Sequence, residues 1–536
     1  MKPFDANGAF HPTAEGHKLR QLAVRGVGAT LLSGGLGLAI QVVATMVLAR
    51  LLTPKDFGLI TMVTTFSLLL MNFGLNGFTE AIIQREELDH ALASNLFWIN
   101  VGASFVIAIA FAGAGSLLTG LYKDPRVAAV TQVMALTILI TGLSVIHMAL
   151  LKRAMRFSVV SVIDILGRVG SVVVSIVLAR AGWGYWALVA GALAVPAVTC
   201  ILALTVCRWI PGFPRRASGT GAMVLFAINT YGRFSTGYFA NNLDNFLIGW
   251  RLGATPLGFY KKAYDLFVLP SSQLSIGLVN VAISALSRLQ RNLEQYRKYF
   301  LSALGVMAFV GMGLGADLTL IGKDLILILL GTKWGESGPI FVLLGPGIGI
   351  MLLYYTHIWI HVSIGRADRW FRWGLIDVAI TSLSLLVGIH WGAKGIALAW
   401  VVAYWIITLP ALWYAGRPIG LGISKVISVT WRYLLASAMA GAVVALIEQA
   451  IPSLMAAQGS LWALCRALVI SALFLALYLG AVVGLHRGCA PLNQVARLLR
   501  EMASRGGSSE SAPSFEDRAE WPEVATDVYV AAKDHE

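Results

Sequence analysis

The chain of 536 residues is 57% hydrophobic and only 13% charged, and its mean hydropathy is +0.74. Soluble domains usually contain about 25% charged residues, so this composition excludes an ordinary soluble protein and indicates a polytopic membrane protein. The net charge of +14 would suggest a nucleic-acid partner in a soluble protein. Here most Lys and Arg residues occupy short loops, where they orient membrane helices, so no nucleic-acid partner is expected.

Apolar stretches long enough to cross a bilayer recur along most of the chain, since a helix needs about 20 residues to span the hydrocarbon core. They predict an all-α protein with about fourteen transmembrane helices and short connections. The predicted spans are 26–49, 57–83, 93–118, 127–150, 157–179, 184–207, 222–249, 259–286, 299–321, 337–362, 372–391, 395–415, 431–451 and 461–485. The longest outward-facing connection, 322–336, is too short to hold an extramembrane domain.

Lysine and arginine residues concentrate in every second loop. The loops predicted to be cytoplasmic hold 17 of them, and the opposite loops hold 11, counting Lys261 and Lys262 among the latter. Because positive residues favour the cytoplasmic side, both termini are expected in the cytoplasm. Residues 1–25 then form a polar cytoplasmic segment without the pattern of a cleavable signal peptide, and residues 208–221 form a cytoplasmic linker.

Two pairs of similar stretches share one spacing in the sequence. At an offset of 200 residues, LLTPKDFGL (51–59) aligns with RLGATPLGF (251–259), and GAGSLLT (113–119) aligns with GLGADLT (313–319). Each alignment is weak by itself because Gly and Leu are abundant, but the shared offset predicts an internal repeat. Parallel repeats of this kind form one recurrent transporter architecture, with the substrate site between the halves.

The repeat predicts the organisation of the whole chain. Residues 26–207 and 222–415 are expected to form two lobes of six helices each, and residues 431–485 two extra C-terminal helices. Residues 486–536 are expected to form a cytoplasmic tail with a short amphipathic helix on the membrane surface, followed by a disordered end rich in Ser, Gly, Glu and Asp.

The seventh predicted span, which contains YGRFSTGYFANNLDNFLIGW (231–250), carries charges inside an apolar stretch. A charge in hydrocarbon costs at least about 2.5 kcal/mol. On one continuous helix, Arg233 and Asp244 would share a face about 16 Å apart, with Asn229 on the same side and Asn241 beside it. Because Arg233 has no acidic residue one turn away, this polar face favours a water-filled cavity over a neutralised ion pair.

Two other spans carry opposite charges at i, i+4 spacing. Asp164 and Arg168 lie in the fifth span, and Lys261 and Asp265 open the eighth. Either pair can neutralise itself on its own helix or contribute to a cavity, and the spacing alone does not decide between the two.

Further polar residues have weaker patterns. Asn72 and Asn76 lie on one face of the second span, with Glu80 near its end, and Asp317 comes late in the ninth. His357 and His361 have the spacing of two zinc ligands, but no third ligand is evident, so helix packing is favoured and no metal site is expected. The phosphate-binding GxxxxGK pattern is lacking as well, which argues against an ATP-driven pump in one chain.

Three stretches carry a resemblance to a known family, namely RGVGATLLSGGLGLAIQVVATMVLARLLTPKDFGLITMV (25–63), LGATPLGFYKKAYDLFVLPSSQLS (252–275) and LLGTKWGESGPIFVLL (329–344). On these, residues 18–485 resemble the Wzx-type polysaccharide flippases, in the polysaccharide-transporter branch of the MOP superfamily. The resemblance implies a two-lobed bundle of twelve helices plus two, with a central cavity open alternately to each side. It also implies a substrate, an undecaprenyl-diphosphate-linked oligosaccharide that crosses from the cytoplasmic to the periplasmic leaflet of the bacterial inner membrane.

The resemblance also implies which residue types bind the substrate. Cationic residues in the cavity would suit an anionic head group, and an arginine can bond two phosphate oxygens at once; the candidates are Arg25, Arg50, Arg168, Arg233 and Arg251. Amide side chains would bond sugar hydroxyls; the candidates are Asn72, Asn76, Asn229 and Asn241. Protons or sodium could couple to transport through an acidic residue, the candidates being Glu80, Asp164, Asp244, Asp265 and Asp317. No other cofactor is expected.

Two other classes of function remain as alternatives. The first is another MOP transporter, either a cation-coupled drug exporter, which would prefer an acidic cavity, or a flippase for a peptidoglycan precursor. The second is an enzyme, namely a polysaccharide polymerase, ligase or glycosyltransferase, but such enzymes usually need a sizeable extracytoplasmic domain. No enzyme activity is therefore expected. The expected partners are the lipid bilayer and the lipid-linked glycan, with a polysaccharide polymerase and chain-length proteins as further candidates.

Cysteine labelling tests the predicted topology. A membrane-impermeant maleimide should reach a cysteine at position 333 from the extracytoplasmic side and one at position 292 only from the cytoplasmic side, because one membrane span separates the two loops. Labelling of both positions from the same side would contradict this topology.

Overall fold

The structure, a computed structural model, describes residues 3–5, 8–10, 16–85, 87–215, 219–451, 459–489 and 492–493. Residues 1–481 form one compact unit, and a second unit begins at Val482. In the described residues all regular secondary structure is helical, apart from isolated bridges that join Phe4 to Phe10 and Ala9 to Asp89. The predicted tail lies almost entirely outside the described residues, so its amphipathic helix stays a prediction.

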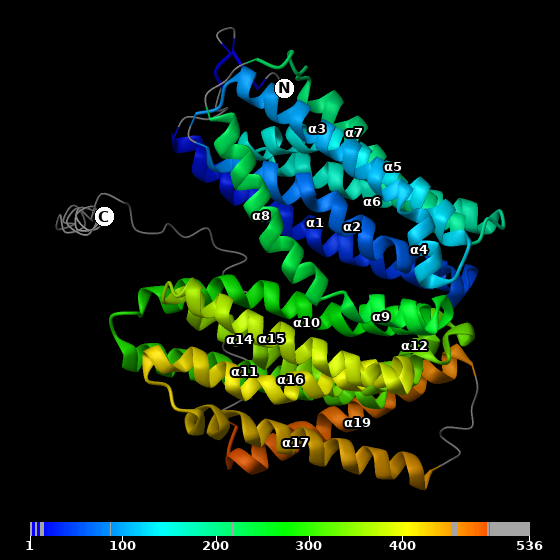
Figure 1. Ribbon diagram of the computed structural model, residues 1–536. Coiled ribbons are helices and arrows are strands. Elements are labelled where there is room, and N and C mark those ends of the chain that lie inside the picture. Colours follow the sequence, from blue (N-terminus) through cyan, green and yellow to red (C-terminus); the bar gives the residue numbers. More distant parts are fainter. Residues whose placement is uncertain are drawn as a thin grey trace. The chain divides into compact units, whose positions relative to one another are not determined.

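The first group of helices precedes residue 208. It contains α1 (Gly16–Leu51), α2 (Pro54–Gln84), α3 (His90–Gly113), α4 (Gly115–Tyr122), α5 (Arg126–Arg153), α6 (Phe157–Arg180) and α7 (Tyr185–Cys207) (Figure 1). Helix α5 packs against α2, α3 and α7, while α6 packs against α1 and α7. α1 begins well before the predicted start of the first span at residue 26, whereas α5, α6 and α7 match their predicted spans closely.

The second group runs from α8 to η3. It contains α8 (Thr220–Ala240), α9 (Leu243–Leu252), α10 (Ala254–Arg288), α11 (Leu293–Leu320), α12 (Gly322–Leu330), η1 (Thr332–Trp334), α13 (Ser337–Leu344), α14 (Pro346–Ser363), α15 (Ala367–Gly388), η2 (Ile389–Trp391), α16 (Gly392–Gly416) and η3 (Arg417–Ile419). Helix α14 packs against α10, α11 and α16, as α5 does against α2, α3 and α7 in the first group. This shared packing pattern supports the internal repeat.

Two helices follow the second group, α17 (Ile423–Ala450) and α19 (Ser460–His486). Helix α17 packs against α11, and the Tyr478 hydroxyl of α19 donates to the Phe309 carbonyl of α11 at 2.7 Å. Within the described residues, eleven helical segments are long and apolar enough to cross a membrane, and one of them, 367–419, contains both α15 and α16. The all-α membrane class is thus confirmed, while the count of fourteen spans stays a prediction.

The seventh predicted span is two helices, and the prediction of one continuous helix over 222–249 is wrong. Helix α8 ends at Ala240, and α9 begins at Leu243. The side chains of Asn241 and Asn242 donate to backbone carbonyls four residues earlier, at 2.8 and 3.0 Å, and such local bonds compete with continuation of a helix. α8 packs against α2, and α9 packs against α10. Arg233 and Asp244 therefore do not share a face of one straight helix.

Helices α2 and α10 meet at two glycines that align in the repeat. A Cβ added to Gly58 would lie 1.7 Å from the carbonyl oxygen of Ala254, and one added to Gly258 would lie 1.8 Å from that of Pro54. Each glycine therefore faces the first residue of the other helix. The two glycines are 200 residues apart in the sequence, and so are the two first residues, Pro54 and Ala254. Reciprocal contacts of this kind arise when two copies of a unit are related by a two-fold rotation.

Alanine substitutions test this crossing. Gly58→Ala and Gly258→Ala should each lower the thermal stability of the purified protein, because a methyl group at either position would have to push a carbonyl of the other helix away. Overpacking of this kind typically costs about 1–3 kcal/mol. Gly102→Ala on α3 is the matched control, since a Cβ there meets nothing within 4 Å. Equal melting temperatures for all three variants would contradict the close crossing.

Candidate functional site

Three neighbouring cavities lie along α1, and Gln41 lines all of them. The first, about 350 Å³, contains Asp164 and Arg168 of α6. The second, about 270 Å³, lies beside α2, α7 and α10, and the third, about 290 Å³, lies between α1, α10 and α12. Lys261 and Asp265 line both the second and the third. The shared lining residues make the three cavities one candidate binding region.

Arg168 brings a positive charge to the first cavity. Its guanidinium lies against α1 at Gly37, where an added Cβ would be 3.6 Å from Nε. In the part of the chain that the structure describes, no carboxylate forms an ion pair with Arg168, although Asp164 lies one turn away and lines the same cavity. The side chain is exposed, so its charge is available to an anion in the cavity.

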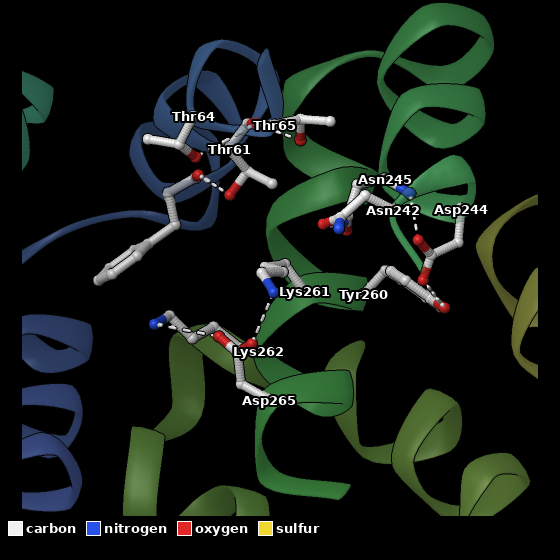
Figure 2. Close-up of polar contacts among 11 residues, drawn as sticks. Thr61, Thr64, Thr65, Asn242, Asp244, Asn245, Tyr260, Lys261, Lys262 and Asp265 are labelled. Atoms are coloured by element: carbon white, nitrogen blue, oxygen red, sulfur yellow. Dashed lines mark hydrogen bonds and ion pairs between the residues drawn. The ribbon is translucent and has the colours of Figure 1, made fainter. Parts of the chain in front are cut away.

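Two lysines and one aspartate of α10 form the charged cluster of the second cavity. The Lys261 ammonium is 2.8 Å from Oδ1 of Asp265, and the Lys262 ammonium is 3.8 Å from Oδ2 (Figure 2). Lys262 also lies over the Phe57 ring, 4.3 Å from its centroid, in a cation–π contact. Because one carboxylate serves two ammonium groups, the cluster keeps a net positive charge.

The beginnings of α2 and α10 position this cluster. Thr53 and Asp56 form a capping box at the start of α2, with Pro54 in the first turn, and this combination fixes where the helix begins. Gly253, with φ +88°, provides the turn from which α10 starts. The cluster consequently lies two turns inside α10. The sequence pattern placed Lys261 and Asp265 at the start of the eighth span, and both lysines were also counted with the outer loop before it.

The buried carboxylate of Asp244 lies in α9, where Tyr260 of α10 contacts it. It accepts hydrogen bonds from the Tyr260 hydroxyl at 2.6 Å and from the backbone N–H of Asn245 at 2.7 Å, and only 1% of its surface is exposed (Figure 2). Among the described residues, no cation forms an ion pair with it, and it is not among the lining residues of the three cavities. This arrangement joins α9 to α10.

Other predicted site residues have partners elsewhere. Arg50 donates to the Ile328 carbonyl of α12 at 3.0 Å, and Asp317 accepts the Ser471 hydroxyl of α19 at 3.2 Å. Asn72 donates to a carbonyl of its own helix at 2.7 Å, as Asn241 does at the end of α8. These four residues are not among the lining residues of the three cavities.

The remaining candidates are exposed or not described. Arg251, Asn229 and Glu80 are exposed at positions other than the cavity linings. The side chains of Arg25, Asn76 and Arg233 lie outside the described residues, although all three positions are helical. Of the predicted residues with described side chains, the structure therefore gathers Arg168, Asp164 and Asp265 at the cavities.

Sequence reasoning missed three contributors to the site, Gln41, Phe57 and Lys262. Gln41 and Phe57 belong to the first group of helices and Lys262 to the second, so only the folded chain brings them together. The one available signal was the pair of adjacent lysines in KKAYD (261–265). Both were counted with a loop, and only Lys261 was paired with Asp265.

Proteins of polysaccharide biosynthesis are similar in sequence to this chain. A family model described as "Polysaccharide biosynthesis protein" matches residues 47–339, more than half of the chain. The succinoglycan biosynthesis transport protein ExoT of Rhizobium meliloti (strain 1021) is 23% identical over 429 residues, which are 78% of this chain and 85% of that protein. The lipopolysaccharide biosynthesis protein WzxC of Escherichia coli (strain K12) is 23% identical over 407 residues, which are 73% of this chain and 79% of that protein.

One solved structure is similar along most of the chain. It is the lipid II flippase MurJ in an inward closed conformation, with a TM-score of 0.67 and 14% sequence identity, and the match covers 87% of this chain and 99% of that chain. At this identity the likeness concerns the fold alone.

A double-mutant cycle tests the contact between Tyr260 and Asp244. Tyr260→Phe should lower the melting temperature of the purified protein, because a buried carboxylate that loses a hydroxyl donor costs about 1–3 kcal/mol. Asp244→Asn replaces the carboxyl group that accepts the hydroxyl, so the double variant should be less destabilised than the sum of the two single effects. Strictly additive effects would show that the two side chains are not coupled.

Proposed function

The chain belongs to the polysaccharide biosynthesis protein family, and we propose that it carries an undecaprenyl-diphosphate-linked oligosaccharide across the membrane through the region that Gln41, Arg168 and Lys261 line. The proposed direction is from the cytoplasmic to the periplasmic leaflet of the bacterial inner membrane. The product would serve the synthesis of exopolysaccharide, O-antigen or capsule. The observation that carries the proposal is the excess of cationic side chains facing cavities inside a membrane bundle.

The chemistry of a lipid diphosphate suits these side chains. The guanidinium of Arg168 can bond two phosphate oxygens at once, while Lys261 and Lys262 act as point charges with rotatable donors. Water can solvate these cations when the site is empty, and phosphate oxygens replace that water when substrate enters. Arg233 stays a candidate for the same role, because its helix α8 packs against α2, which lines the second cavity.

The rest of the substrate needs two other environments. Sugar hydroxyls need hydrogen-bonding partners, which the first cavity offers in Gln41, Asp164, Ser171 and Thr199. The polyprenyl chain can stay in the bilayer beside the bundle, because it is as apolar as the lipid. A drug exporter for cationic compounds fits less well, since two lysines share one carboxylate at the second cavity and Arg168 lines the neighbouring first cavity.

The proposal includes the orientation of the chain in the membrane and the energy source for transport. With both termini in the cytoplasm, the crossing of α2 and α10 would close the cavities on the periplasmic side. Asp164 and Asp265 are the acidic residues that line the cavities, so either is a candidate for coupling transport to protons or sodium. A polysaccharide polymerase and chain-length proteins would be the partners that receive the exported repeat unit.

Polysaccharide export by cells that depend on this chain tests the assignment. Arg168→Ala should lower export at least about tenfold, because charge-assisted hydrogen bonds contribute about 1.5–3 kcal/mol each. Arg168→Lys should recover part of it, since lysine supplies the charge without the fork. Arg180→Ala, an exposed arginine at the end of the same helix, is the matched control. Normal export by Arg168→Ala at normal membrane level would refute the role of this residue.

A further inference from the structure

Trp334 joins the ends of three long helices. This residue of η1 is fully buried, and its indole N–H donates to the Ala49 carbonyl near the end of α1 at 2.8 Å. Its ring packs edge-on against Phe57 of α2 and Phe259 of α10, with centroid distances of 5.4 and 6.1 Å. One side chain therefore holds the end of α1 and the beginnings of α2 and α10 together.

Side chains on both sides of Trp334 donate hydrogen bonds to backbone carbonyls of α1 and α10 and strengthen this closure. Lys333 donates to the Arg50 carbonyl at 3.2 Å, and Ser337 donates to the Phe259 carbonyl at 2.8 Å. All of these donors lie in LLGTKWGESGPIFVLL (329–344), a stretch of which the linings of the three cavities include Leu329 alone. Its role in the structure is to close the end of the bundle at which α2 and α10 cross.

Phe57 connects this closure to the cationic cluster. The ring that packs against Trp334 also lies under the ammonium of Lys262. Lys262 is the less completely paired lysine, because its ammonium is 3.8 Å from the Asp265 carboxylate, compared with 2.8 Å for Lys261. An anion in the cavity would thus find Lys262 held mainly by an aromatic ring.

A phosphate oxygen competes well for such a lysine. Charge-assisted hydrogen bonds to phosphate are about twice as strong as neutral ones, whereas a cation–π contact is a modest interaction. An anion that takes Lys262 therefore removes one stabilising contact from Phe57, and Phe57 is the residue against which Trp334 packs. Losing that contact makes the closed arrangement less stable, because Lys262 of α10 no longer holds the Phe57 ring of α2 in its place against Trp334.

We propose that Lys262, Phe57 and Trp334 form a switch through which a phosphate-type anion bound in the cavity releases the closure at this end of the bundle. The inference rests on the proposed function in that the anion is taken to be the diphosphate of the lipid carrier. Lys262 and Trp334 are positioning residues here: the first senses the anion, and the second holds the helices.

A cysteine inside the cavity reports opening. Thr45 lines the second and third cavities. The substitution Thr45→Cys is introduced into the full chain, in which serine replaces the exposed cysteines Cys465 and Cys489. An impermeant maleimide is applied to vesicles from the side that labels Ala181→Cys. Ala181 marks the end of the bundle at which α2 and α10 cross. The loop that follows α6 brings Gly184 close to Asp56 of α2, and a Cβ added to Gly184 would lie 3.7 Å from Oδ1 of Asp56.

Farnesyl diphosphate, farnesol and inorganic pyrophosphate are the three probes. Farnesyl diphosphate should raise the labelling rate of Thr45→Cys by about threefold to thirtyfold, the range that loss of one cation–π contact allows, while farnesol should not. A rise with pyrophosphate alone would show that the free anion suffices, and a rise only with farnesyl diphosphate would show that the lipid is needed; both results support the switch. An equal rise with farnesol would overturn it.

Variants separate the parts of the switch. Lys262→Gln should raise labelling without any probe and abolish the further rise. Lys262→Arg, which keeps a cation over the ring, should recover part of the response, because lysine and arginine are not interchangeable. Trp334→Phe should raise labelling without a probe, because it loses the bond to Ala49. Trp391→Phe, an exposed tryptophan of η2, is the matched control. Wild-type labelling in both Lys262→Gln and Trp334→Phe would overturn the proposal.

The melting temperature of the same proteins distinguishes this failure from failure of the proposed function. Farnesyl diphosphate should raise the melting temperature of the wild type, and Arg168→Ala should reduce that rise. If the rise occurs but labelling never changes, the switch is wrong while anion binding stands. If farnesyl diphosphate raises the melting temperature of neither the wild type nor any variant, the cavities do not bind the anion, and the proposed function is wrong as well.

Discussion

The close crossing of α2 and α10 is the constraint on which the rest of the structure depends. Because each helix places the carbonyl of its first residue where the other would carry a Cβ, only glycine fits at Gly58 and Gly258. The crossing brings Phe57 against Lys262 and puts the α10 cluster beside α1 and α7. A larger residue at either glycine would separate the two groups of helices and disperse a site to which both contribute.

The cavities carry more positive than negative side chains. Charges inside a membrane persist where they are paired or hydrated. Here Asp265 compensates only one of two lysines, and Arg168 has no ion pair within the described part of the chain. The cavities therefore favour an anion, whereas Asp324 and Arg466 bond each other between α12 and α19 and offer no free charge.

Much of the fold could be predicted from the sequence, but less of the site. Apolar length located α5, α6 and α7 within a few residues, and the offset of 200 identified the two glycines that meet. The break after α8 was missed because local asparagine bonds, not hydropathy, end that helix. Lys262 was missed because its role depends on Phe57, which is distant in sequence, and Asp317 was a candidate although it bonds Ser471 of α19. Helical periodicity identifies a polar face but not the helix that covers it.

Translocation in vesicles tests the central claim most directly. The purified protein would be reconstituted with a fluorescent polyprenyl-diphosphate oligosaccharide, and an impermeant quencher would report how much of it lies in the outer leaflet over time. The account predicts that the wild type equilibrates the lipid between leaflets, and that a variant combining Arg168→Ala, Lys261→Gln and Lys262→Gln, folded by its melting curve, does not. Translocation by that variant at the wild-type rate would contradict the account.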